Sequence, residues 1–378
     1  MRTTRHRIFQ PPTGSFFLFG PRGTGKTLWT RSAFPGALMV DLLDPVEART
    51  MAARPERLRE RLAAATAVTN VVIDEVQKMP VLLEMVHQMI ASGSPYRFIL
   101  TGSSARKLRR GEVNLLGGRA IRCVMHPYVA SELGSDFELD RALRIGMIPV
   151  VVESDDPEQT LRSYVALYIY EEVLSEGLSR NAEQFARFLE AISFSHAQVL
   201  NVSNVARDCG VKRKTVEHSI EILEDLMLGS RLPVFTHHAK REVVSHPKFY
   251  FFDTGVYRAL RPFGPLDDRT AIDGHALEGL VAQHLRAYCD YAADGRRLYY
   301  WRTRTNVEVD FVVYGPETFM AIEVKNVNEV RPADVRGLRS FLELYPQAQA
   351  TLLYRGAERL KMHGIMIEPL TPWLQALV

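Results

Sequence analysis

The sequence contains few cysteines and no hydrophobic run long enough to cross a membrane. Its 3 cysteines, at positions 123, 209 and 289, do not form a C-x-x-C pair. Such spacing excludes a disulfide framework and a zinc knuckle, and it favours a reducing compartment. The basic residues at positions 1–7 are not followed by a long apolar segment, so no export signal is predicted. We therefore expect a cytoplasmic protein that makes no membrane contact.

The sequence also lacks a strong excess of charge of either sign, and it shows neither internal repeats nor low-complexity tracts. Its 47 Lys and Arg residues nearly balance 44 Asp and Glu residues, which gives a net charge of +3. A composition with 46% hydrophobic and 24% charged residues excludes wholesale disorder. The length of 378 residues predicts two or three domains. The charge leaves nucleic acid open as a partner without arguing for it.

The first part of the chain alternates strand-like and helix-like segments. The strand-like segments have nearly continuous apolar runs, which is typical of parallel strands covered by helices on both faces. We expect strands at 16–19, 37–41, 70–74 and 98–101, with helices at 56–66 and 82–91. The fold class predicted for this part is α/β with a parallel sheet.

A glycine-rich loop follows the first expected strand. It fits the pattern G-x-x-x-x-G-K-[ST] in full, and its residues are Gly20, Pro21, Arg22, Gly23, Thr24, Gly25, Lys26 and Thr27. The glycines let backbone N–H groups approach phosphates, the lysine supplies a point charge, and the last hydroxyl coordinates Mg²⁺. The pattern therefore predicts a P-loop that binds ATP with Mg²⁺.

Two further strands supply the partners that ATP hydrolysis requires. Asp74 ends the apolar segment 70–74 and is expected to hold Mg²⁺, while Glu75 beside it can polarise the attacking water. Thr101 and Ser103 end the segment at 98–103, and either hydroxyl could lie beside the γ-phosphate or cap the following turn.

Basic residues follow this third strand. Arg119, after a pair of glycines, is a candidate arginine finger for a neighbouring subunit, or else a surface ion pair. Arg109 and Arg110 belong to a basic loop that faces either nucleic acid or solvent. An arginine finger acts between subunits, so it predicts a homo-oligomer, such as a ring.

The middle of the chain is helical. Helices are expected at 161–175 and 181–195, followed by a helix at 202–208, a turn at Gly210 and a helix at 211–228. The last pair predicts a helix-turn-helix, with wing strands at 231–235 and 246–252. Lys212, Arg213 and Lys214 begin the second helix, where a recognition helix contacts DNA, although such modules also serve as protein spacers.

The last part contains a carboxylate–lysine pattern. A helix at 274–288 carries Glu278, and strands are expected at 298–302, 307–314 and 319–326. Asp310 and Glu323 lie on two strands joined by a Gly-Pro turn, so they are expected to converge, and Lys325 shares the face of Glu323. Carboxylates that hold Mg²⁺, or Mn²⁺, and a lysine beside the attacking water suit metal-assisted phosphodiester hydrolysis. An amphipathic hairpin with a polar face is the simpler alternative.

Taken in order, these motifs extend over nearly the whole chain. They resemble the prokaryotic AAA-type ATPases fused to a C-terminal domain of unknown function of the PD-(D/E)XK nuclease class. The resemblance implies an AAA-type P-loop ATPase domain at 1–155, a helical linker and winged helix-turn-helix at 156–246, and an α/β restriction-endonuclease-like domain at 247–378. It implies Glu278, Asp310 and Glu323 as metal ligands, Lys325 as their partner in catalysis, and DNA as the substrate.

Three functions remain open from the sequence. The first is an enzyme that couples ATP hydrolysis to DNA remodelling or cleavage. The second is a nucleotide-switched module that binds DNA or protein and whose nuclease fold is inert. The third is a defence-type nuclease for which ATP is a licensing signal.

Overall fold

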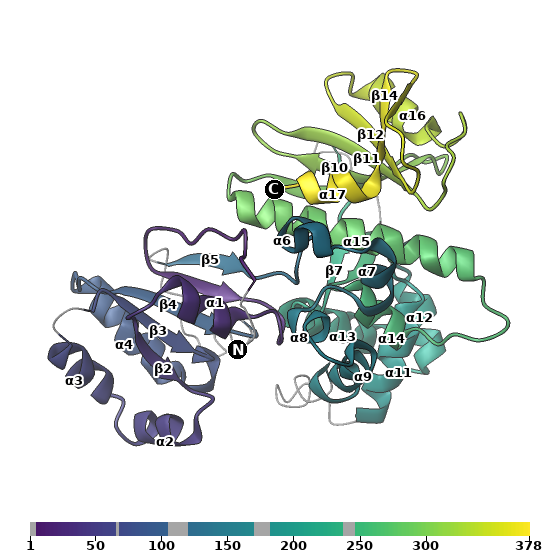
Figure 1. Cartoon of the computed structure of the whole chain (residues 1–378). Coiled ribbons are helices and arrows are strands. Elements are labelled where there is room, and N and C mark those ends of the chain that lie inside the picture. The colour runs from purple at the N-terminus through teal and green to yellow at the C-terminus, as the bar shows by residue number, and fades with distance from the viewer. Residues whose placement is uncertain (1–4, 66–67, 105–119, 170–181, 237–245) are drawn as a thin grey trace. The chain divides into compact units, whose positions relative to one another are not determined.

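The computed structural model describes all residues except 1–4, 66–67, 105–119, 170–181 and 237–245 (Figure 1). The chain divides into two compact units. The first contains residues 1–126 with 225–227, and the second contains residues 127–224 with 228–378. The boundary expected after residue 246 falls inside the second unit, because strands on both sides of it share one sheet.

The first unit contains the predicted parallel sheet. Its strands lie in the order β2-β3-β4-β1-β5, with every pair parallel. Their bounds are Phe16–Phe19 for β1, Leu38–Asp41 for β2, Asn70–Asp74 for β3, Arg97–Gly102 for β4 and Ile121–Val124 for β5. The first four match the expected segments. The sequence does not predict β5, because this edge strand exposes Ile121 and Arg122 and so lacks a buried apolar run.

Helices connect these strands. Their bounds are Lys26–Ala33 for α1, Pro45–Ala53 for α2, Arg57–Ala64 for α3 and Pro80–Ala91 for α4. Helix α4 buries Leu82, Leu83, Val86 and Met89, the helical spacing that predicted it. Helix α2 was not predicted, because it buries only Met51 and is marked mainly by its Asp44 N-cap.

The second unit begins with short helices. They are α6 at Ala130–Leu133, α7 at Leu139–Ile145, α8 at Pro149–Val152, α9 at Pro157–Ser163 and α11 at Ala182–Ser193. The helix expected at 161–175 instead changes at Tyr164 into a π-helix, Tyr164–Ile169, and residues 170–175 lie outside the described chain. Tyr164 and Ile169 are both buried, and the wider π turn places residues five apart on one face.

The expected helix-turn-helix is present, with a small sheet behind it. Helix α12 (Val202–Cys209) ends at Gly210, whose φ of 66° favours glycine, and α13 spans Arg213–Asp225. The strands are β6 (Gln198–Val199), β7 (Gly229–Leu232) and β8 (Lys248–Phe251). They form an antiparallel sheet in the order β6-β8-β7, which makes β8 the central strand.

A six-stranded sheet completes the second unit. Its order is β13-β14-β12-β11-β10-β9. The bounds are Arg297–Arg302 for β9, Glu308–Tyr314 for β10, Phe319–Lys325 for β11, Gln349–Tyr354 for β12, Leu360–Met362 for β13 and Ile365–Pro369 for β14. Strands β10 and β11 pair antiparallel, as expected. Strand β9 also pairs antiparallel with β10, whereas β12 pairs with β11 in parallel. The other helices are α14 (Thr254–Leu260), α15 (Arg269–Ala292), α16 (Arg336–Leu344) and α17 (Leu370–Ala376).

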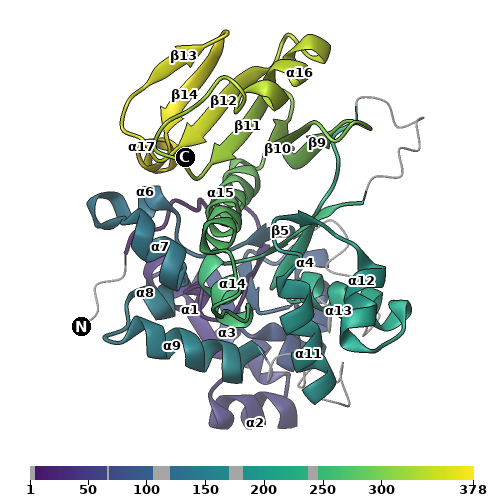
Figure 2. The ribbon, with the colours of Figure 1, turned by 90° about the vertical axis from the view of Figure 1, so that its right-hand side faces the viewer.

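Helix α15 is a central support of this unit, and Figure 2 shows it beside β10 and β11. Twelve of its residues are buried, which is far more than one amphipathic stripe. Within the part of the chain that the structure describes, no helix is both long and apolar enough to span a bilayer.

Two histidines are buried in this unit without charge. The backbone N–H of Ala130 donates to Nε2 of His284 at 2.8 Å, so Nδ1 carries the proton and donates to the Leu280 carbonyl. Burial lowers the pKa of His284 to about 4 and that of His196 to about 3. Both rings are therefore neutral in the folded protein at neutral pH.

We expect His284 to lower the stability of the second unit as the pH falls from 6.5 to 4. In this range the unfolded chain takes up a proton at His284 that the folded chain does not accept, which costs up to about 3 kcal/mol. His284→Gln keeps an acceptor for the Ala130 N–H and does not titrate, so its urea midpoint at pH 4, relative to that at pH 6.5, should be higher than in wild type. The exposed His218→Gln is the matched control. Equal slopes for wild type and His284→Gln would contradict the assignment.

Candidate functional site

The glycine-rich loop joins β1 to α1 at the carboxyl end of the parallel sheet. Gly23 and Gly25 have φ values of 84° and 88°, which disfavour residues with a side chain. A Cβ at Gly20 would collide with the carbonyl oxygen of Met125. The glycines of the predicted pattern therefore set the path of the loop.

Lys26 lies at the centre of this loop. Its ammonium donates to the carbonyls of Gly20, at 2.7 Å, and Pro21, at 3.1 Å, and its side chain is buried. The hydroxyl of Thr24 donates to the same Pro21 carbonyl at 2.8 Å. The loop thus holds one positive charge where the pattern requires it.

Three residues from three elements meet at Asp74. Its Oδ2 accepts a hydrogen bond from the Thr27 hydroxyl at 2.7 Å, and its Oδ1 accepts one from the Thr101 hydroxyl. Asp74 is fully buried, so these bonds satisfy a carboxylate that has little access to water. Hydroxyl and carboxylate oxygens are ligands that suit Mg²⁺. The residues present therefore fit the ion that the loop pattern implies.

Glu75 follows Asp74 in an unusual backbone conformation. Its φ of 58° lies in the left-handed region, which costs on the order of 1 kcal/mol for a residue with a side chain. Its N–H donates to Thr101 Oγ1 at 3.2 Å, and its carboxylate accepts from Gln77 Nε2. The same amide donates to Ser103 Oγ at 3.0 Å. The bonds of Gln77 thus tie Glu75 to the end of β4.

Sequence reasoning missed two residues of this site. Gln77 has no motif of its own, although a Cβ at Gly102 would collide with its Oε1. Arg7 is buried and donates to the carbonyls of Thr24 and His126, each at 2.7 Å. Its position before the first strand gave no signal, and it fastens the loop to the end of β5.

The predicted arginine finger and DNA contacts are not among the residues that meet at the glycine-rich loop in the described structure. Arg109, Arg110 and Arg119 are outside the described residues. Lys212, Arg213 and Lys214 are exposed at the start of α13, where Arg213 pairs with Glu217 at 2.9 Å.

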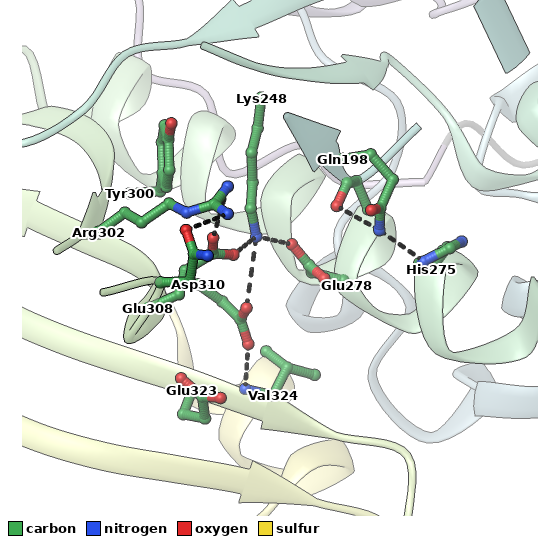
Figure 3. Close-up of polar contacts among 12 residues, drawn as sticks. Gln198, Lys248, His275, Glu278, Tyr300, Arg302, Glu308, Asp310, Glu323 and Val324 are labelled. Atoms are coloured by element: carbon green, nitrogen blue, oxygen red, sulfur yellow. Dashed lines mark hydrogen bonds and ion pairs between the residues drawn. The ribbon is translucent and has the colours of Figure 1, made fainter. Parts of the chain in front are cut away.

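The predicted carboxylates meet in the second unit. Glu278 comes from α15, Asp310 from β10 and Glu323 from β11 (Figure 3). Lys325 is also on β11. The pairing of β9 with β10 shifts register between Val309 and Val312, so Asp310 lies in a bulge. A bulge re-aims side chains, and here Asp310 Oδ2 accepts the N–H of Val324 at 2.9 Å.

A lysine that the sequence analysis did not single out lies among these acids. The ammonium of Lys248, on β8, is 2.6 Å from Glu308, 2.8 Å from Glu278 and 3.4 Å from Asp310 (Figure 3). Only 4% of its side chain is exposed. Burial alone would lower the pKa of Lys248, but Glu278 and the other acids outweigh it, and the pKa lies well above its usual value.

Two carboxyl groups of the cluster resist ionisation. Burial, followed by repulsion from Asp310, raises the pKa of Glu323 to about 8, even though Lys325 donates to its Oε1 at 2.7 Å. Burial also raises the pKa of Glu278 to about 7, against the opposing effect of Lys248. The Tyr250 hydroxyl donates to Glu278 at 2.6 Å. The four acids of the cluster, with Glu308, thus face Lys248, Lys325 and Arg302, which lies 3.8 Å from Glu308.

The fit of a metal ion to this cluster is partial. Glu323 Oε2 is buried and has no hydrogen-bond partner among the described residues, and the Asp310 carboxylate is close enough to repel Glu323, so a divalent cation between the two acids would compensate both charges. Among the described residues, however, no three Asp, Glu, His or Cys side chains are arranged to hold a metal. Glu278 and Glu308 are instead bound by Lys248. Lys248, Glu308 and Tyr250 were missed, although Glu308 lies two residues before Asp310.

Three family models match separate parts of the chain. Residues 13–134 match a family described as an AAA domain. Residues 136–267 and 273–373 match two domains of unknown function, DUF8612 and DUF4143. The first match and the loop geometry together identify residues 13–134 as an AAA-type ATPase domain.

Two curated proteins are similar to most of the chain. The chain is 26% identical over 362 residues to uncharacterized proteins of Mycobacterium tuberculosis (strain ATCC 25618 / H37Rv) and Mycobacterium bovis (strain ATCC BAA-935 / AF2122/97). The match covers 93% of this chain and 78% of each relative.

Solved structures are similar only at low scores. A replication initiator DnaA bound to AMPPCP and single-stranded DNA matches with a TM-score of 0.28 and 16% identity, over 56% of this chain and 82% of that one. Protein VC1899 from Vibrio cholerae matches with a TM-score of 0.21 and 14% identity, over 96% of this chain and 98% of that one. Scores this low support no argument about ligands or partners.

Proposed function

We propose that the N-terminal unit binds ATP with Mg²⁺ and hydrolyses it. The observation that carries the proposal is the meeting of Thr27, Asp74 and Thr101 at the mouth of the glycine-rich loop. Mg²⁺ would neutralise phosphate charge there, and Thr27 and Asp74 would hold it. Lys26 supplies the fixed charge for the terminal phosphates, and the loop N–H groups bind the rest.

Glu75 is the residue that we assign to the attacking water. It follows Asp74 directly, and its carboxylate is oriented by Gln77, which also binds Ser103. An oriented carboxylate can accept the proton of a water that attacks the γ-phosphate. The hydroxyls of Thr101 and Ser103 lie at the end of β4, and we assign to one of them a place beside the γ-phosphate.

Lys26→Ala should abolish nucleotide binding, because the charge at the centre of the loop is lost. Glu75→Gln should bind ATP as tightly as wild type, because only the proton acceptor is removed. Its rate of ATP hydrolysis should fall by a factor of about 10² or more. Equilibrium binding of labelled ATP and release of phosphate measure the two effects. Glu84→Gln, an exposed change on α4, is the control. Undiminished turnover in Glu75→Gln would refute the role of Glu75.

We further propose that the ATPase works as a homo-oligomer, with a ring as the simplest form and Arg119 reaching a neighbour's nucleotide. The proposal rests on the sequence position of Arg119 after two glycines. Sedimentation of the wild type that shows one chain per particle, with and without ATP, would contradict it.

We also propose that helices α12 and α13, with strands β7 and β8, form a winged helix that contacts DNA. The exposed cations Lys212, Arg213 and Lys214 begin α13, and β7 and β8 supply the paired strands of a wing. The basic loop with Arg109 and Arg110 is a second candidate contact. Cations at the start of a recognition helix bind phosphates and bring the helix to the groove.

DNA affinity should fall steeply with salt, because each neutralised phosphate releases counterions. The double change Lys212→Glu and Lys214→Glu should weaken binding and flatten its salt dependence, measured by fluorescence anisotropy of labelled DNA. Lys361→Glu, at another exposed site, is the matched control. Unchanged affinity in the double variant would mean that α13 is a spacer.

A second candidate function is metal-dependent phosphodiester hydrolysis by a nuclease-like domain at 247–378. The observation that favours it is the buried, unpartnered Oε2 of Glu323 beside Asp310, with Lys325 bound to the same glutamate. A divalent ion held there would polarise the phosphate and acidify a water. Asp310 and Glu323 would be its ligands, Glu278 would complete the acid cluster, and Lys325 would orient the water.

Asp310→Ala should reduce Mn²⁺ affinity and DNA cleavage together, because it removes a ligand. Lys325→Ala should keep Mn²⁺ binding and slow cleavage, because only a non-ligand charge is lost. Calorimetric titration with Mn²⁺ and cleavage of branched, single-stranded and double-stranded DNA measure both effects. ATP hydrolysis, which uses other residues, should persist and serves as the folding control. If wild type and Asp310→Ala bind Mn²⁺ equally and neither cuts DNA, the domain is an inert scaffold within a nucleotide-switched binding module.

A further inference from the structure

We propose that Lys248 is a built-in cation that takes the place of a second metal ion, so that the carboxylate cluster binds one divalent ion and not two. The inference rests on the proposed metal site at Asp310 and Glu323. It adds a positioning residue, Lys248, that sets how many ions the site accepts.

The first argument is the position of the ammonium. Lys248 Nζ lies within 3.4 Å of one oxygen from each of Glu278, Glu308 and Asp310, which come from α15 and β10. A bridging metal ion would occupy the same space between these oxygens, at about 2.0–2.6 Å from each. The ammonium and a second ion therefore exclude each other.

The second argument is that Lys248 cannot readily leave. Its side chain is almost fully buried, and its ammonium lies 5.7 Å from the centroid of the Tyr300 ring. Its backbone belongs to the central strand of the β6-β8-β7 sheet. Glu278, its partner, is held in turn by the Tyr250 hydroxyl. Moving the ammonium out would leave three acids without their shared cation, which is costly in a buried site.

The third argument is charge. Four carboxylates face three cations, Lys248, Lys325 and Arg302, the last 3.8 Å from Glu308, which leaves one negative charge when all groups are ionised. One divalent ion already outweighs this charge, and a second ion would make the cluster strongly positive. The free oxygen agrees with this count, because Glu323 Oε2 is the buried carboxylate oxygen without a partner among the described residues of the cluster, and only 9% of its side chain is exposed.

A site with one ion and a site with two ions differ in which groups stabilise the charge that develops during hydrolysis. Two ions stabilise the attacking and the leaving oxygen symmetrically, whereas one ion leaves part of this work to the protein. Lys325 is the group available for it, because its ammonium, paired with Glu323 at 2.7 Å, is partly exposed. Lys248 holds Glu278 and Glu308 in place and does not touch the substrate.

The test counts bound Mn²⁺ by the loss of its free electron paramagnetic resonance signal at equilibrium. All proteins are full-length and carry Asp74→Asn, so that an ion at the glycine-rich loop does not contribute. The parent should bind one Mn²⁺ per chain. Lys248→Met, which keeps the length of the side chain and removes the charge, should bind two, and its melting temperature should rise more with Mn²⁺ than that of the parent. Lys325→Met, the matched control, should still bind one.

Each outcome is decisive. If Lys248→Met is unfolded without metal and Mn²⁺ restores its circular dichroism, a metal can replace the ammonium and the inference holds. If Mn²⁺ does not restore it, or if the folded variant binds the same number of ions with the same affinity as the parent, the inference is overturned. Two ions in the parent would overturn it while the proposed metal site stands. No ion in the parent would overturn the inference together with the proposed metal-dependent hydrolysis.

Discussion

The second unit is organised around the ion pairs of one buried ammonium. Lys248 belongs to the small sheet behind the helix-turn-helix, and its partners belong to α15 and to a strand of the six-stranded sheet. Three elements that are far apart in the sequence are thus joined at one nitrogen. Removing one partner of a buried ion pair costs about 3–5 kcal/mol, because the remaining charge is uncompensated. The arrangement of the whole carboxylate cluster depends on this contact.

The first unit also contains a buried carboxylate that needs partners, but there hydroxyl groups take the place of an ammonium. Asp74 is fully buried, and its carboxylate is stabilised by hydrogen bonds from the hydroxyls of Thr27 and Thr101. These bonds place a loop residue and a strand residue on either side of the carboxylate. The two units therefore use opposite solutions: one acid held by neutral donors, which leaves it able to bind a cation, and several acids held by a cation of their own.

The sequence predicted those parts of the two sites whose residues are close together in the chain. The bounds of β3 matched because its apolar run ends at Asp74, and the loop pattern is contiguous from Gly20 to Thr27. Asp310 and Glu323 were placed together because a short turn joins their strands. About half of the elements of the six-stranded sheet were not predicted, since the segment after residue 326 carries no comparable pattern.

The residues that were missed are long-range contacts. Lys248 meets Asp310 across 62 positions and Arg7 meets His126 across 119 positions, and no spacing rule connects such pairs. Gln77 was missed for another reason, since a single polar residue after a strand is common on surfaces. Its burial against Gly102 is what gives it a role, and burial is a property of the fold and not of the local sequence.

The position of Lys248 on β8 also links the helix-turn-helix to the carboxylate cluster. Strand β8 pairs with β7 through Leu232 opposite Lys248, and β7 follows directly after α13. The backbone hydrogen bonds of the β7–β8 pair fix the position of Lys248 beside the strand that follows α13. Three carboxylates are bound to that lysine, and they come from α15 and β10. Strand β8 therefore belongs by its backbone to the small sheet and by its lysine to the carboxylate cluster.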